Sequence, residues 1–145
     1  MPGLTANLVL QTLILATGSG GPSYADAYHD TATTGRPLLV LVGADWCPAC
    51  RAMKSSTMAN MQRHGKLRQV AYAVVNTDHD QTLASQLMQG SSIPQLVLFR
   101  RTDRGWQRSR LIGAHSEQQI ESFIGHTETL EVRHPVNAAA AIGAE

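Results

Sequence analysis

The chain contains only two cysteines among its 145 residues, and this scarcity excludes two classes of small protein. Two thiols cannot build a disulfide-dense scaffold, and they cannot supply the four thiolates of a structural zinc site. Charged residues are also few, at 16% of the chain, beside 12 glycines and 6 prolines. This composition is typical neither of a disordered chain nor of a collagen-like one, so most of the chain should fold.

An excess of charge of either sign is missing as well. The 12 Lys and Arg residues against 11 Asp and Glu leave a formal net charge of +1. A nearly neutral chain offers no electrostatic reason to bind nucleic acid or an anionic membrane surface. No apolar run approaches the roughly 18 residues of a membrane-spanning helix, and the length suits one compact domain but not two. The class of partner must therefore be inferred from a site.

The N-terminal segment is open to two interpretations. Leu4 to Ala16 is about as long as the apolar core of a signal peptide, but the first basic residue is Arg36, so the usual basic start is missing. Residues 1–22 are therefore either a signal or targeting segment or an arm of the domain, in which Asn7 to Leu15 would form an edge strand. We favour the targeting segment, which would place the protein in an exported or periplasmic location and not in the cytoplasm.

The hydrophobic pattern of the rest of the chain predicts alternating strands and helices. Apolar runs or strict alternation predict four strands, at residues 38–42, 70–75, 95–99 and 106–112. Apolar residues at helical spacing predict four helices, at residues 24–32, 51–64, 79–88 and from a Ser116–Gln119 capping box onward. The polar turn 101–105 joins the last two strands into a hairpin. Residues 131–145 carry no apolar stripe and are expected to form a flexible tail.

This order of elements predicts an α/β domain at residues 23–130. We expect a mixed sheet whose parallel central strands are joined by right-handed helical crossovers, with an antiparallel hairpin at one edge. Helices should cover both faces of the sheet, because the strands at 38–42 and 70–75 are apolar on both sides.

The two cysteines lie three positions apart, at Cys47 and Cys50, where a buried strand meets a helix. Two cysteines placed at random would have this spacing in roughly 1 case in 70, so the pair is informative. The first sulfur would lie at the helix N-terminus, where free backbone N–H groups stabilise a thiolate, and the second would lie one turn into the helix. Pro48 suits that first turn. We predict that Cys47 is the attacking thiolate and Cys50 the resolving thiol.

These residues also admit other interpretations. The pair could be a static disulfide or half of a metal site, but none of the six histidines has a paired ligand spacing with the thiols, so we predict no metal. Trp46 can cap the core beside the strand end, wall the thiol against water, or do both. Met53, Met58 and Met61 are expected to pack in the core in preference to forming an adaptable binding surface.

From about residue 24 to 130 the chain resembles the thioredoxin superfamily. The matching segments, in order, are 44–50 (ADWCPAC), 76–78 (NTD), 92–99 (SIPQLVLF) and 112–114 (IGA). The stretch from Gly35-Arg36-Pro37 through Cys47, with Ala49 and Cys50, is most similar to the periplasmic thioredoxin-like domain of the bacterial transmembrane disulfide reductase and to small exported relatives. The resemblance implies a thioredoxin-like fold and exchange of dithiol for disulfide without a cofactor.

Carried over residue by residue, the resemblance makes Cys47 the nucleophile, Cys50 the resolving thiol and Pro94 a cis proline facing the pair. Such a proline turns the chain sharply and leaves the peptide groups of Ile93 to pair with an extended substrate. We therefore expect Trp46, Ile93 and Pro94 to bind substrate. The expected partners are protein thiols or disulfides and an electron donor, and the protein is expected to be a monomer.

Three departures from the family pattern bear on the direction of the reaction. Leu41 stands where typical thioredoxins bury an aspartate that helps to deprotonate the resolving thiol. Pro48 and Ala49 replace the Gly-Pro of thioredoxin, and Ala49 takes the place of the histidine found in the strong bacterial oxidant. Without that cation we expect a reduction potential nearer about −270 mV than about −120 mV. This favours a thiol–disulfide oxidoreductase acting as a reductant or thiol carrier.

Two functions of other classes stay open on the sequence. A peptide-binding or chaperone-like module could hold extended peptides beside Ile93 and Pro94, with incidental cysteines. A metal-handling protein could use Cys47, Cys50 and a nearby histidine.

Overall fold

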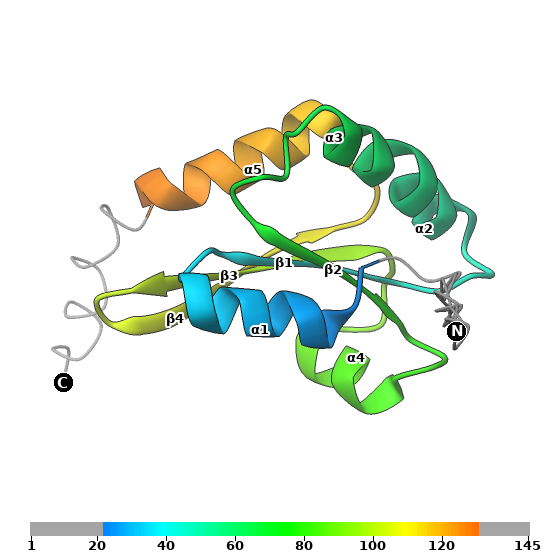
Figure 1. Ribbon diagram of the computed structural model, residues 1–145. Coiled ribbons are helices and arrows are strands. Elements are labelled where there is room, and N and C mark those ends of the chain that lie inside the picture. The colour runs from blue at the N-terminus through cyan, green and yellow to red at the C-terminus, as the bar shows by residue number, and fades with distance from the viewer. Residues whose placement is uncertain (1–21, 131–145) are drawn as a thin grey trace, which may run out of the picture.

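The computed structural model describes residues 22–130, in which a four-stranded sheet lies between two layers of helices (Figure 1). The elements are α1 (Tyr24–Thr34), β1 (Leu38–Gly43), α2 (Pro48–Ala52), the π-helical turn η1 (Met53–Met58), α3 (Ala59–Arg63), β2 (Ala71–Asn76), α4 (Gln81–Leu87), β3 (Gln95–Thr102), β4 (Gly105–Ile112) and α5 (Glu117–Leu130). The predictions for residues 1–21 and 131–145 lie outside the described residues. Within residues 22–130, no helix has the length and apolar character needed to cross a membrane.

The sheet is mixed and has the strand order β2-β1-β3-β4. Only β1 and β2 are parallel, whereas β1 pairs with β3, and β3 with β4, in antiparallel register. The expectation of parallel central strands is therefore wrong, because the central pair β1 and β3 is antiparallel. A third strand parallel to β1 would have to begin at the opposite end of the sheet, and α4, with seven residues and a length of about 10 Å, covers only about half of that distance. The chain re-enters the sheet at the end where β2 stops, so β3 runs antiparallel to β1.

Helices cover both faces of the sheet, as the apolar runs predict. In Figure 1, α2, α3 and α5 lie over one face, and α1 and α4 over the other. Alternate residues of β1 enter the two cores: Leu39 and Leu41 pack beneath the first layer, and Leu38, Val40 and Val42 pack against the second. A strand apolar on both sides is thus fully buried.

The helix after the cysteines differs from the continuous one predicted at 51–64. It begins at Pro48, and its middle turn, η1, is π-helical. In a regular α-helix, residues five apart point about 140° away from each other. The wider turn lets both Met53 and Met58 face the sheet, and these two residues and Met61 are at most 1% exposed. The methionines pack in the core, as expected.

The hairpin is tighter than the predicted turn at 101–105. Thr102 pairs with Gly105, so Asp103 and Arg104 alone form the turn and β3 runs three residues past Phe99. The predicted capping box of the last helix is confirmed: the Ser116 N–H donates to Gln119 Oε1 at 2.9 Å, and the Gln119 N–H donates to Ser116 Oγ at 3.3 Å.

Candidate functional site

Cys47 and Cys50 lie at the carboxyl end of β1 and are joined by a disulfide, with their Cα atoms 5.2 Å apart. A short loop after Gly43 leads into α2, and the Cys47 N–H donates to the Ala44 carbonyl at 3.2 Å. Both cysteines are buried, with 6% and 4% of their surface exposed. The end of a central strand and the start of a helix therefore hold the pair in place.

Cys47 is the N-cap residue of α2. Its backbone is extended, Pro48 occupies the first turn, and its Sγ accepts a hydrogen bond from the Cys50 N–H at 3.2 Å. The helical segment that follows runs without interruption to Arg63. An N-cap sulfur faces the unpaired N–H groups and the positive end of the helix dipole, and both stabilise a thiolate there after reduction.

Cys50, the predicted resolving thiol, is enclosed by the backbone of β1. A Cβ atom built on Gly43 would lie 2.8 Å from the Cys50 Cβ and 2.9 Å from its Sγ, closer than real carbon contacts allow. Only glycine fits at this position without movement of Cys50. Sequence reasoning missed Gly43, although a glycine that ends an otherwise apolar strand is a signal of close backbone approach.

The loop before β3 covers the other side of the pair. The Ile93–Pro94 peptide bond is cis, and Ile93 packs against the cluster of Ala44, Cys47 and Cys50. Pro94 itself is buried, and its carbonyl accepts from the Gly113 N–H at 2.8 Å. Among residues 22–130, no hydrogen bond engages the peptide N–H or carbonyl of Ile93.

Gln95 holds this loop in place and was not found from the sequence. Its amide is fully buried: Oε1 accepts from the Gln89 N–H at 3.1 Å, and Nε2 donates to the carbonyls of Gln89 at 2.9 Å and Ser92 at 2.8 Å. Three hydrogen bonds from one side chain thus fix the segment that carries Ile93. A polar residue at the start of an apolar strand is the only sequence signal of this role.

Trp46 does not cap the core, contrary to one of its two expected roles. The side chain is 67% exposed, and its Nε1–H donates to Asp78 Oδ2 at 3.0 Å. Trp46 and Ile93 line one groove of about 380 Å³, together with Thr77, Met88 and neighbouring residues of α4. The structure therefore brings two of the three predicted substrate-binding residues together, while buried Pro94 does not line the groove.

In the part of the chain that the structure describes, no three His, Cys, Asp or Glu side chains are grouped so that they could hold a metal ion. Leu41, where the resemblance leads one to expect an aspartate, is a leucine with 2% exposure. Ala49 is apolar and packs against the cluster that contains both cysteines. Positions 41 and 49 therefore place no charged group beside the two sulfurs.

Comparison with known proteins identifies the family. A family model described as thioredoxin-like matches residues 21–100, more than half of the chain. This chain belongs to the thioredoxin-like family. No curated protein matches it. A thioredoxin-like domain with a Cys-x-x-Cys pair in disulfide contact is the arrangement of a thiol–disulfide oxidoreductase.

Solved structures of thioredoxins share this fold. The thioredoxin of Thermus thermophilus is 19% identical, with a TM-score of 0.58 over 86% of this chain and 95% of that one. The Fasciola hepatica thioredoxin is 22% identical, with a TM-score of 0.54 over 68% of this chain and 88% of that one. Trxlp of Edwardsiella tarda is 26% identical, with a TM-score of 0.55 over 71% and 95%. The thioredoxin-like fold expected from the sequence is confirmed.

Proposed function

We propose that the protein reduces protein disulfides, or carries thiols between proteins, through the Cys47–Cys50 couple. One observation carries the proposal: the Cys47 sulfur occupies the N-cap of a long helical segment and accepts the Cys50 N–H, beside a groove that contains Ile93. A sulfur so placed is stabilised as a thiolate, and an extended peptide can be presented to it.

The reaction proceeds in two exchange steps. In the reduced protein, the Cys47 thiolate attacks one sulfur of a substrate disulfide, so that a mixed disulfide forms and the other substrate sulfur leaves as a thiolate. The Cys50 thiol then loses its proton and attacks the Cys47 sulfur, which releases the second substrate thiolate. Two electrons pass to the substrate, and the protein is left with the disulfide seen in the structure. An external thiol donor must reduce the pair again.

The residue before Cys50 supports a reducing role. Ala49 packs against the disulfide where the strong bacterial oxidant has a histidine, so no imidazolium is placed there to stabilise the reduced form. A less stabilised dithiol is a better reductant. Titration against glutathione, with alkylation of free thiols as the readout, should give a potential near or below about −230 mV. A value above about −180 mV would exclude the reducing role.

Trp46, Ile93 and Pro94 are proposed to hold the substrate. Trp46 and Ile93 line a common groove, and Ile93, next to Pro94, packs against the cysteine cluster. A substrate strand paired with these groups would bring its disulfide to Cys47.

The deciding experiment traps the mixed disulfide. Reduced Cys50→Ser protein incubated with insulin should form a covalent adduct, because Cys47 attacks the insulin disulfide and no second thiol resolves the product. Dithiothreitol should cleave this adduct by reducing the mixed disulfide. Cys47→Ser should form no adduct, and both variants should lose at least about 100-fold in catalysed insulin reduction. If Cys50→Ser forms no adduct while the protein still binds unfolded chains, the chain is a peptide-binding module with incidental cysteines. Copper or zinc retained in stoichiometric amounts would instead indicate metal handling.

A further inference from the structure

Cys50 faces a chemical problem in the second exchange step. It must become a thiolate in order to attack, yet its side chain is 4% exposed, and burial disfavours the charged form. Leu41, packed in the core, offers no group that could accept the proton. Assistance must come from other residues near Cys50.

A small cavity of about 30 Å³ lies next to Cys50. Leu41 and Gly43 form its apolar wall, and its polar wall consists of Asp45, Arg51, Lys54 and Asn76. This volume suits one or two water molecules, and the wall offers them several polar partners. The cavity therefore provides a polar route between a buried thiol and the surface.

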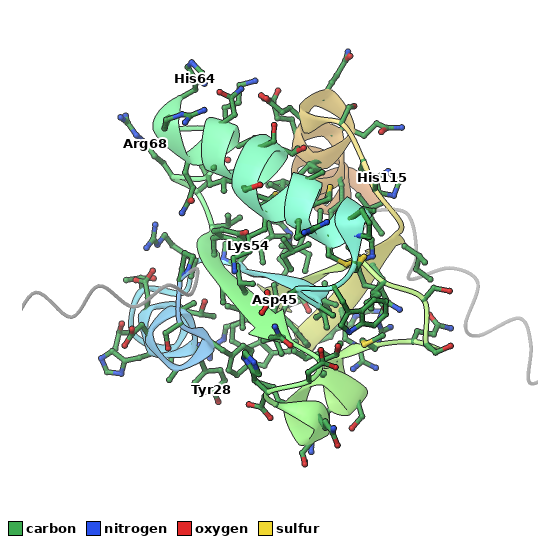
Figure 2. All side chains as sticks on the ribbon, turned by 90° about the vertical axis from the view of Figure 1, so that its right-hand side faces the viewer. Tyr28, Asp45, Lys54, His64, Arg68 and His115 are labelled. Atoms are coloured by element: carbon green, nitrogen blue, oxygen red, sulfur yellow. A yellow bond between two sulfur atoms is a disulfide. The ribbon has the colours of Figure 1, made fainter. Side chains whose placement is uncertain are left out.

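Lys54 is the cation best placed to act on this route. It lies four residues after Cys50 on the same helical segment, and residues at this spacing share one face. Lys54 is half-buried, whereas Arg51 is exposed. Figure 2 shows Lys54 and Asp45 on the same side of the molecule, Lys54 on the helical segment and Asp45 on the loop after β1.

The charges around the cavity favour an anion on Cys50. Two cations, Arg51 and Lys54, and one carboxylate, Asp45, line the cavity, while Asn76 at the end of β2 is neutral. Asp45 and Lys54 also line a larger groove of about 690 Å³ that His79 and Asp80 border from the far side of β2. The thiolate of Cys50 would thus form beside a net positive wall.

We propose that Lys54 is a positioning residue for the resolving step, acting through the cavity beside Cys50, an inference that rests on the proposed function. Its ammonium group stabilises the forming Cys50 thiolate, and water in the cavity carries the thiol proton to solvent. The thiolate then forms the bond to the Cys47 sulfur as the bond from Cys47 to the substrate sulfur breaks and the substrate leaves as a thiolate.

Stopped-flow reaction of the reduced protein with dithionitrobenzoate separates the two steps. Cys47 releases the first thionitrobenzoate in a phase that depends on reagent concentration, and Cys50 releases the second in a phase that does not. A nearby opposite charge lowers the pKa of an acid by about one unit or more. We therefore expect Lys54→Met to raise the pKa of Cys50 and to slow the second phase about tenfold at neutral pH. Its pH profile should move about one unit toward alkaline pH, while the first phase changes less than about twofold.

The controls use the same residue types. The chain has one other lysine, Lys66, which binds Glu117 at 3.2 Å on the far part of the helical layer, and Lys66→Met should leave the pH profile of the second phase in place. Lys54→Arg should restore most of the rate because it restores the charge.

An unshifted pH profile in Lys54→Met, with a wild-type protein that shows both phases, would overturn this inference alone. A slower second phase with an unshifted profile would also overturn it, because that is the result of a merely structural change. A wild-type protein that releases no thionitrobenzoate would contradict the proposed function itself.

Discussion

The two sulfurs of one disulfide lie in unlike surroundings. On the Cys47 side, Trp46 and Ile93 line an open groove of about 380 Å³. On the Cys50 side, Gly43 encloses the cysteine, and the cavity that Gly43 and Leu41 line has a volume of only about 30 Å³. Under the proposed function, one helical turn separates a sulfur that meets the substrate from one that meets only Cys47 and loses a proton. The unlike surroundings match the two exchange steps proposed for the motif.

Leu41→Asp, on the Cys50 side, should have the largest effect on the stability of the protein. A carboxyl group at a position that is 2% exposed loses its hydration, which raises its pKa above the value of about 3.9 in the unfolded chain. The Leu41→Asp variant is therefore least destabilised below about pH 4, where the carboxyl group is neutral in both the folded and the unfolded chain. Its free energy of unfolding falls as the pH rises through the pKa that the carboxyl group has in the folded chain. We expect a loss of about 3–5 kcal/mol at neutral pH, measured by urea unfolding.

Leu41→Asn is the matched control, because it has the shape of the carboxyl side chain without its charge. Its loss of stability should be the same at about pH 5 and about pH 8, whereas that of Leu41→Asp should grow between them. Equal losses for the two variants at both pH values would show that the Cys50 side is hydrated, and the contrast between the two sides would fail.

Gln95→Ala tests the Cys47 side, and its effect on stability should be intermediate. It removes three hydrogen bonds that hold the loop carrying Ile93, so unfolding should become easier by about 1–3 kcal/mol. The KM for insulin should rise, while the second thionitrobenzoate phase stays unchanged, since Cys50 lies on the other side. Gln86→Ala, an exposed position on α4, should change neither quantity. A slower second phase in Gln95→Ala would show that the two sides are coupled.

Trp46→Ala should have the smallest effect, restricted to substrate binding. The side chain is 67% exposed, so stability should stay within about 1 kcal/mol. Removing an aromatic wall of the groove should raise the KM for insulin about 3- to 10-fold and leave the reaction with dithionitrobenzoate unaltered. Trp106, the other tryptophan, lies on β4 and is 50% exposed, and Trp106→Ala serves as the control. Equal effects of the two variants would remove Trp46 from the proposed substrate site.

Much of the fold could be predicted because the signals are local. A run of apolar residues such as 38–42 predicts a buried strand wherever it occurs, and Ser116 with Gln119 predicts a helix start from two side chains and their own backbone. The direction of β3 could not be predicted in this way. It depends on the path that α4 takes across the sheet, and no residue within β3 encodes that path.

The same contrast between local signals and tertiary contacts applies to the candidate site. By itself the sequence determined the spacing of Cys47 and Cys50, their place at a strand end and the N-cap position of the first, since all three depend on neighbours in the chain. Only the tertiary structure decided that Gly43 encloses Cys50, that Trp46 binds Asp78 and that Gln95 locks the loop of Ile93. These contacts join segments brought together by packing, and a side chain's partner across such a contact is decided by the path of the whole backbone.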